Sequence, residues 1–173
     1  TSDYGNDVFQ QATSEGKDTG NNENGDVVFK NLELGTYKLS ETKTKEGYIL
    51  SQTEWTVQVD ENGNVVLRNA DGIEVEKNSN SVYQIENEPL HSMRFVKSST
   101  YGDNIFLEGA EFSLNGVSDY DTNTEKTGIS GSDGIVTIDG LEPGTYQLQE
   151  TKAPKDHDLN TTIYTVVVKG DGK

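Results

Sequence analysis

The sequence predicts an all-β protein made of two antiparallel β-sandwiches in tandem, and three observations lead to this prediction. Residues 25–64 align without a gap with residues 134–173, and 17 of these 40 positions are identical, so the repeated unit has the size of a whole domain. Short segments rich in β-branched and aromatic residues alternate between apolar and polar positions, which is typical of antiparallel strands. Clusters of Gly, Asn and Asp separate these segments, and no stretch keeps a helical period.

The repeat also predicts which strands each unit contains. In the first unit the expected strands are VVFKNL (27–32), TYKLSE (36–41), EWTVQV (54–59), VVLRN (65–69) and SVYQIEN (81–87). In the second unit they are MRFVK (93–97), GAEFSL (109–114), IVTIDGL (135–141), TYQLQE (145–150) and IYTVVV (163–168). The first unit has no counterpart of MRFVK and GAEFSL, and the second has none of VVLRN and SVYQIEN. We therefore expect the first sandwich to lack its N-terminal strands and the second its C-terminal strands.

The boundary between the two domains is expected near ENEPLHSM. The strand SVYQIEN ends there, Pro89 stops strand pairing, and a new strand begins two residues after His91. This gives one domain at 1–90 and another at 91–173. A short linker that contains proline limits domain motion and suits a rod more than a hinged pair.

Composition excludes several functional classes. The net charge of −16 and the pI near 4.3 disfavour nucleic acid and anionic membranes as partners. The chain has no cysteine, which rules out disulfides, thiolate metal sites and a cysteine nucleophile. His91 and His157 are solitary, and NNENGD and DENGN fit hairpin turns better than calcium loops. We expect no metal, no cofactor and no membrane insertion.

Polar side chains interrupt the inward apolar face of four predicted strands. Residues two apart share a face of a strand. In each of the four strands, two apolar residues and then a polar one follow each other on the same face. The four sets are Tyr37, Leu39 and Glu41; Tyr146, Leu148 and Glu150; Met93, Phe95 and Lys97; and Tyr83, Ile85 and Asn87.

Taken together as one composite domain, these positions supply a lysine, a glutamate and an asparagine to an apolar interior. An apolar environment lowers the pKa of an amine and raises that of a carboxylic acid, so both can be neutral there. The amine can then attack the amide carbon of asparagine while the acid shuttles protons and ammonia leaves. Simpler interpretations remain open: Glu41 and Glu150 at strand ends near solvent, a Lys97 that extends to water, and an Asn87 that only ends a strand.

These residues lie in motifs that resemble the Cna-B family of Gram-positive surface proteins, a transthyretin-like, Ig-like sandwich also found in pilins. The similar segments are GAEFSL, GIVTIDGLEPGTYQLQETKAP with its twin GDVVFKNLELGTYKLSETKTKEGY, and the terminal IEN. The resemblance implies that Lys97 is the reactive lysine and Glu150 the acid of the second unit. It implies that Glu41 is the acid and Asn87 the acceptor of the first. TKEGY lacks the family's proline, and APKDH replaces its usual Gly-Tyr.

From the resemblance we expect a structural stalk or presentation module of a pilin or adhesin, reinforced by Lys-Asn isopeptide bonds and not an enzyme. Its expected place is extracellular and attached to the cell wall through an anchor outside this chain. The expected partners are neighbouring domains or subunits, and possible ones are a host matrix protein or glycan. Two alternatives stay open: an adhesive region that binds such a ligand through loops 10–25 and 116–133, and a split domain completed by a partner strand.

Overall fold

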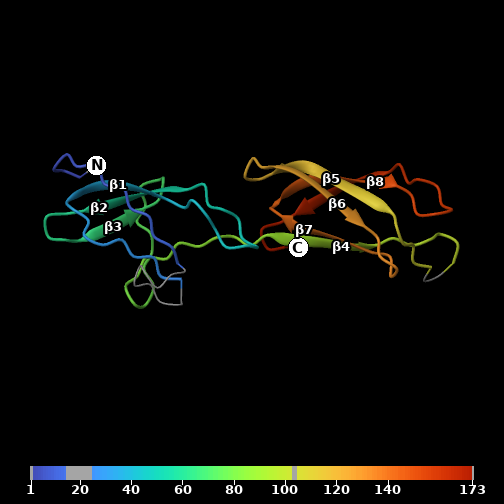
Figure 1. The fold of residues 1–173 in the computed structure, drawn as a ribbon, viewed down its shortest axis with the longest axis horizontal. Helices are drawn as coiled ribbons and strands as arrows, with labels where there is room; N and C mark the ends of the chain where they lie inside the picture. Colours follow the sequence, from blue (N-terminus) through green and yellow to red (C-terminus); the bar gives the residue numbers. More distant parts are fainter. Residues whose placement is uncertain (1, 15–24, 103–104, 173) are drawn as a thin grey trace. The chain divides into compact units, whose positions relative to one another are not determined.

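The computed structural model describes residues 2–14, 25–102 and 105–172, and within these ranges the chain contains strands and no helix (Figure 1). This confirms the all-β prediction. The strands are β1 (Gly35–Ser40), β2 (Glu54–Val59), β3 (Val65–Arg68), β4 (His91–Val96), β5 (Glu111–Ser118), β6 (Asn123–Ile129), β7 (Ile135–Leu141), β8 (Gly144–Lys152) and β9 (Ile163–Val168).

The chain divides into two compact units. The first comprises Thr1–Lys43 and Leu50–Glu86, and the second comprises Thr44–Ile49 and Asn87–Lys173. The second unit therefore takes up one short segment, Thr44–Ile49, from the first repeat, whereas all residues of the first unit precede Asn87. A domain boundary after residue 90 stays a prediction.

The described part of the first unit forms one antiparallel sheet in the order β1-β2-β3. Leu39 lies opposite Trp55, and Val57 lies opposite Leu67. The apolar residues of alternating positions therefore gather on one face, where Trp55, Val59 and Leu67 are buried.

The second unit contains two sheets that enclose a core. One sheet pairs β4 with β7, and the other has the order β6-β5-β8-β9 (Figure 1). Alternating residues of β5, β7 and β8 point between the sheets, as expected for a sandwich. The core consists of Ala110, Phe112, Leu114, Val136, Ile138, Leu141, Tyr146 and Leu148.

Two predicted strands are wrong, and the reason is the same for both. Residues 27–32 and 81–87 form no named strand, and Tyr83 makes only an isolated bridge with Lys77. The equivalent of 27–32 in the second unit is β7, which pairs with β4. A strand needs a neighbour for its backbone groups. Among the described residues, neither 27–32 nor 81–87 is part of a sheet.

The segment 116–133, expected as a loop, contains a strand instead. β5 continues to Ser118, and the polar segment NTEKTGI forms β6 at the edge of the four-stranded sheet. An edge strand with exposed side chains has no need of an apolar pattern, which is why the composition suggested a loop. The other expected binding loop, 10–25, lies mostly outside the described residues. Recognition of a host matrix protein or glycan remains a prediction from the sequence.

Both repeats fix the start of the strand that carries the inward glutamate in the same way. The hydroxyl group of Tyr37 donates a hydrogen bond of 2.8 Å to the carbonyl of Glu33, and that of Tyr146 donates one of 2.8 Å to the carbonyl of Glu142. Tyr146 is completely buried, so its hydroxyl needs this partner. The tyrosine thereby holds the turn against the strand that continues to the glutamate.

Candidate functional site

Lys97 and Glu150 form an ion pair between the two sheets of the second unit. The distance from Lys97 Nζ to Glu150 Oε1 is 2.8 Å, and the side chains are 16% and 1% exposed. Lys97 directly follows β4, whereas Glu150 lies in β8 of the other sheet. The structure thus brings together two residues that the sequence placed on inward faces of separate strands.

Backbone contacts hold Lys97 at this position. Its N–H donates to the carbonyl of Gly134 at 2.8 Å, and its carbonyl accepts from the N–H of Leu107 at 3.0 Å. Beside it on β4, the ring of Phe95 meets that of Phe112 edge to face, with 4.9 Å between centroids. Because Phe112 is the cross-strand partner of Glu150, the aromatic contact fixes the spacing of the two sheets next to the ion pair.

A second contact orients the carboxylate of Glu150. The backbone N–H of Asn160 donates to Glu150 Oε2 at 2.6 Å. The first unit repeats this bond, because the N–H of Ser51 donates to Glu41 Oε2 at 2.9 Å. In both units the donor follows the glutamate by ten residues. Sequence reasoning missed these donors, although the gap-free repeat preserves the spacing.

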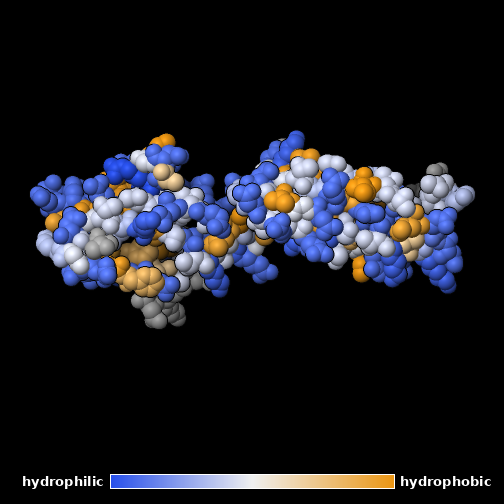
Figure 2. Space-filling view, turned by 90° about the horizontal axis from the view of Figure 1, so that it is seen from above, coloured by the Kyte–Doolittle hydropathy of each residue, from blue (hydrophilic) through white to orange (hydrophobic). Residues whose placement is uncertain are grey.

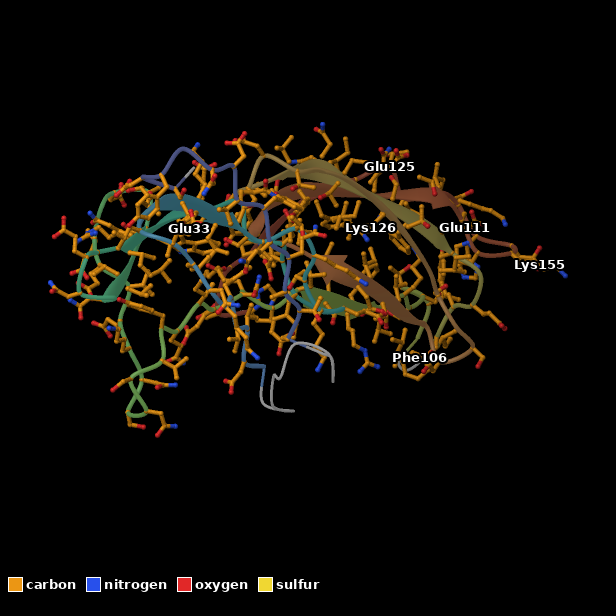
Figure 3. All side chains as sticks on the ribbon, turned by 60° about the vertical axis from the view of Figure 1, so that its left-hand side comes forward. Glu33, Phe106, Glu111, Glu125, Lys126 and Lys155 are labelled. Carbon is orange, nitrogen blue, oxygen red and sulfur yellow. The ribbon has the colours of Figure 1, made fainter. Side chains whose placement is uncertain are left out.

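Lys97 is the partner of a deeply buried oxygen of Glu150. Glu150 Oε1 is buried, and among the described residues its one polar partner is the ammonium group of Lys97 at 2.8 Å, which offsets the cost of burying this oxygen. The pair Lys152–Glu111 is different: its side chains are 66% and 40% exposed, and Glu111 lies at the surface of the second unit (Figure 3). Chemically, the buried pair can exchange a proton between an amine and a carboxylate inside a largely dry interior.

The other two predicted site residues belong to different units. Glu41 is half-buried in the first unit. Asn87, also half-buried, belongs to the second unit, where its side-chain amide donates to the carbonyl of Ile49 at 2.9 Å. Their roles as acid and acceptor remain proposals. The described residues contain no cluster of three histidine or acidic side chains able to hold a metal ion, and none of their segments is a helix that could cross a membrane.

Tyr120, in the turn between β5 and β6, has a high pKa. A hydrogen bond with Glu88 raises the pKa of Tyr120 to about 12, with smaller contributions from burial and from the charges of Glu88, Glu142 and Asp119. Because the neutral phenol is favoured in the folded state, its contribution to stability is present below pH 10 and is lost as the pH rises through about 12.

In a spectrophotometric titration we expect Tyr120→Phe to remove one tyrosinate transition near pH 12, while Glu88→Gln moves that transition toward the ordinary tyrosine pKa of 10.0. An unchanged transition in Glu88→Gln would contradict the assignment.

The match to a protein-family model supports the same fold. The SpaA model, described as a prealbumin-like fold domain, matches residues 3–71 and 91–173. None of the curated protein sequences matches the chain. Among solved structures, the Bacillus anthracis TIE protein is 22% identical with a TM-score of 0.44, and the match covers 87% of this chain and 25% of that one.

Two further similar structures come from pili. For the T6 backbone pilin of Streptococcus pyogenes serotype M6 the identity is 16% and the TM-score 0.39, with 68% of this chain and 24% of that one covered. For the C-terminal fragment of the pilus adhesin SpaC from Lactobacillus rhamnosus GG the identity is 19% and the TM-score 0.43, with 86% and 68% covered. The chain thus spans about a quarter of the length of the TIE protein and of the T6 backbone pilin.

Proposed function

Because the chain belongs to the SpaA prealbumin-like fold family, we propose that it is a structural module of a Gram-positive surface protein, a pilin or an adhesin stalk. Its place is extracellular, attached to the cell wall through a part outside this chain, with neighbouring domains or subunits as partners. The observation that carries the proposal is the buried ion pair of Lys97 and Glu150, with 2.8 Å between Nζ and Oε1. An ion pair with no chemical role could lie at the surface, where charged groups need not be buried.

The chemistry of this pair is the formation of an isopeptide bond. A proton passes from Lys97 to Glu150, and the neutral amine attacks the side-chain amide carbon of an asparagine. A new C–N bond forms, the C–N bond to the asparagine nitrogen breaks, and Glu150 delivers protons so that ammonia leaves. Asn160, through its N–H, keeps Oε2 in place, which leaves Oε1 to face the amine. The reaction occurs once in each molecule and produces a covalent link, so the module is not an enzyme.

The link has a clear mechanical use. The chain has no cysteine and therefore no disulfide, and small β-domains with thin cores depend on such cross-links. A bond from Lys97 ties the end of β4 to the strand that carries the acceptor. Force applied along the chain is then borne by covalent bonds. On the face in Figure 2 the apolar side chains of the second unit are dispersed among hydrophilic ones, which suits a module that presents other domains.

Peptide mass spectrometry tests the proposal on the protein isolated from its native surface. We expect a peptide that contains Lys97 to be joined to an asparagine-containing peptide and to be lighter than the sum of the two by one ammonia. Glu150→Gln should abolish this cross-link, whereas Glu111→Gln, which changes an exposed ion pair, should leave it intact. Finding Lys97 entirely unmodified in the native protein would refute the isopeptide function.

A further inference from the structure

We propose that the outer face of the β4–β7 pair binds the same face of a second copy of the chain, in a two-fold contact centred on Val96 and Ile135. The contact goes beyond the proposed function, because Lys97 points to the opposite, inward face and takes no part in it. A two-fold contact uses one patch on both copies and closes as a dimer.

Alternation along the two strands places four side chains on this outer face. Phe95 packs against the core, so its neighbours Arg94 and Val96 point away from the core. On β7, Ile135 lies opposite Val96, and Thr137 lies opposite Arg94. Cross-strand partners share a face of a sheet, so these four residues form two adjacent rows on the outside of the second unit.

The same face continues past the end of β4 to Phe106. Ser98 follows Val96 by two residues and pairs with Phe106 in an isolated bridge, so both point outward with Val96. An added Cβ on Gly134 would lie 3.1 Å from Phe106 Cβ and 3.3 Å from Val96 Cγ1. The two apolar side chains therefore lie next to each other, and Figure 3 shows Phe106 at the outside of the second unit.

The centre of this face is apolar, exposed and hollowed. Val96 is 50% exposed and Phe106 48% exposed, and Ile135 is half-buried. A hollow of about 230 Å³ is lined by Arg94, Phe95, Val96 and Ile135. A facing surface with apolar side chains of the same size would fill the hollow and remove this apolar area from water.

Charge restricts which partner can cover the patch. The chain has a net charge of −16, so two copies repel each other wherever acidic groups meet. Here one cation and one anion lie at opposite ends: Arg94 comes two residues before Val96, and the exposed Asp133 comes two residues before Ile135 on the antiparallel strand. Among the described residues Arg94 forms no ion pair, so its guanidinium group is available to a partner.

Two-fold symmetry matches these charges. When two such faces stack with their strands antiparallel and the row of Val96 and Ile135 at the centre, the Arg94 end of one copy lies over the Asp133 end of the other. Stacked sheets are about 10 Å apart, a gap that an arginine and an aspartate side chain bridge together. The guanidinium group can also lie on the ring of Phe106 of the second copy. An isologous contact repeats each pair, so it contains two such ion pairs.

The same charges favour a second copy over an unrelated partner. A basic partner would pair with Asp133 and face Arg94 with a like charge, and an acidic partner would do the reverse. A second copy satisfies both groups at once. Because a face of two strands is small, the contact belongs to the weak and transient class, and copies held close together on a surface would reach the concentrations that it requires.

Charge reversal in the full chain tests the two-fold contact. At about 0.15 M salt, which screens the general repulsion between copies, sedimentation of the wild type should show reversible dimers. Arg94→Asp and Asp133→Arg should each raise the concentration for half-association by about tenfold or more, because each places like charges opposite each other. An equimolar mixture of the two variants should associate like the wild type, since both ion pairs of the mixed dimer then join opposite charges. A mixture no better than either variant alone, or a wild type that stays monomeric up to about 1 mM, would overturn the proposal.

Matched variants exclude a general loss of structure. Asp133→Asn keeps an oxygen for the N–H of Ile135, which Asp133 Oδ1 accepts at 3.0 Å, and it should still weaken association. Val96→Asp should abolish association, because docking would bury an unpaired charge. Val117→Asp makes the same change at a valine that is also 50% exposed but lies in β5 of the other sheet, and it should have no effect. Equal losses in the two valine variants would place the contact elsewhere and refute the patch.

The contact and the isopeptide function can fail separately. Lys97→Arg keeps the inward charge beside Glu150 and should form dimers like the wild type. Dimers with the expected pattern in a protein whose Lys97 is unmodified would keep the contact and refute the isopeptide function. A cross-linked Lys97 in a protein that never forms dimers would keep the function and refute the contact.

Discussion

Glu150→Gln is expected to lower the free energy of unfolding of the second unit by about 3 kcal/mol, the lower end of the range for breaking a buried ion pair. The substitution keeps the shape of the side chain and an oxygen that can accept from the N–H of Asn160. It removes the charge that faces Lys97, whose side chain is only 16% exposed. The ammonium group then keeps its position at the cost of an unpaired charge, or the lysine leaves the interior and opens the edge of the core.

Urea denaturation, monitored by amide hydrogen exchange in β4 and β8, measures this loss of unfolding free energy. The sole tryptophan, Trp55, lies in β2 of the first unit, so its fluorescence reports separately on that unit and should change little. Glu111→Gln serves as the control, because it removes a carboxylate from an exposed pair and should cost about 0 to 1 kcal/mol. Equal losses in the two variants would show that the pair of Lys97 and Glu150 behaves as a surface ion pair.

Gly134→Ala is expected to destabilise the second unit by about 3 kcal/mol and to displace Lys97. Gly134 has a φ of +72°, and an added Cβ would lie 2.5 Å from the carbonyl oxygen of Lys97. A left-handed backbone costs an alanine about 1 to 2 kcal/mol, and forced overpacking adds about 1 to 3 kcal/mol. Since the carbonyl of Gly134 also accepts the N–H of Lys97, any shift that relieves the clash moves the lysine away from Glu150.

Gly109→Ala separates the two contributions. Gly109 belongs to the same unit and has a φ of +82°, but an added Cβ would meet nothing within 4 Å. Its substitution should cost only the conformational part, about 1 to 2 kcal/mol. Denaturation curves for both variants test the difference, and chemical shifts of Lys97 report its displacement. If Gly134→Ala cost no more than Gly109→Ala, the backbone of Lys97 would not be tightly constrained.

Local pattern was enough to predict most strands and the faces of their side chains. The segments TYKLSE and TYQLQE became β1 and β8, and MRFVK, EWTVQV and IYTVVV became β4, β2 and β9. The gap-free repeat also implied equivalent geometry in the two units. Two pairs of equivalent hydrogen bonds show this. The hydroxyl groups of Tyr37 and Tyr146 donate to matching carbonyls, and backbone N–H groups donate to the carboxylates of Glu41 and Glu150. Such features follow from alternation along a strand, which depends on residues close in sequence.

Pairing between distant segments was beyond the reach of local pattern. VVFKNL has the composition of a strand and forms none, whereas the polar segment NTEKTGI forms β6 because β5 supplies its hydrogen bonds. The sequence by itself determined the all-β class, the repeat and the inward positions of Lys97 and Glu150. Only the tertiary structure decided that these two residues, more than fifty positions apart, meet at 2.8 Å, and that the edge of β4 has no partner in the described chain. The physical reason is that both outcomes depend on how two sheets pack and which strands find neighbours, and these are properties of the whole unit.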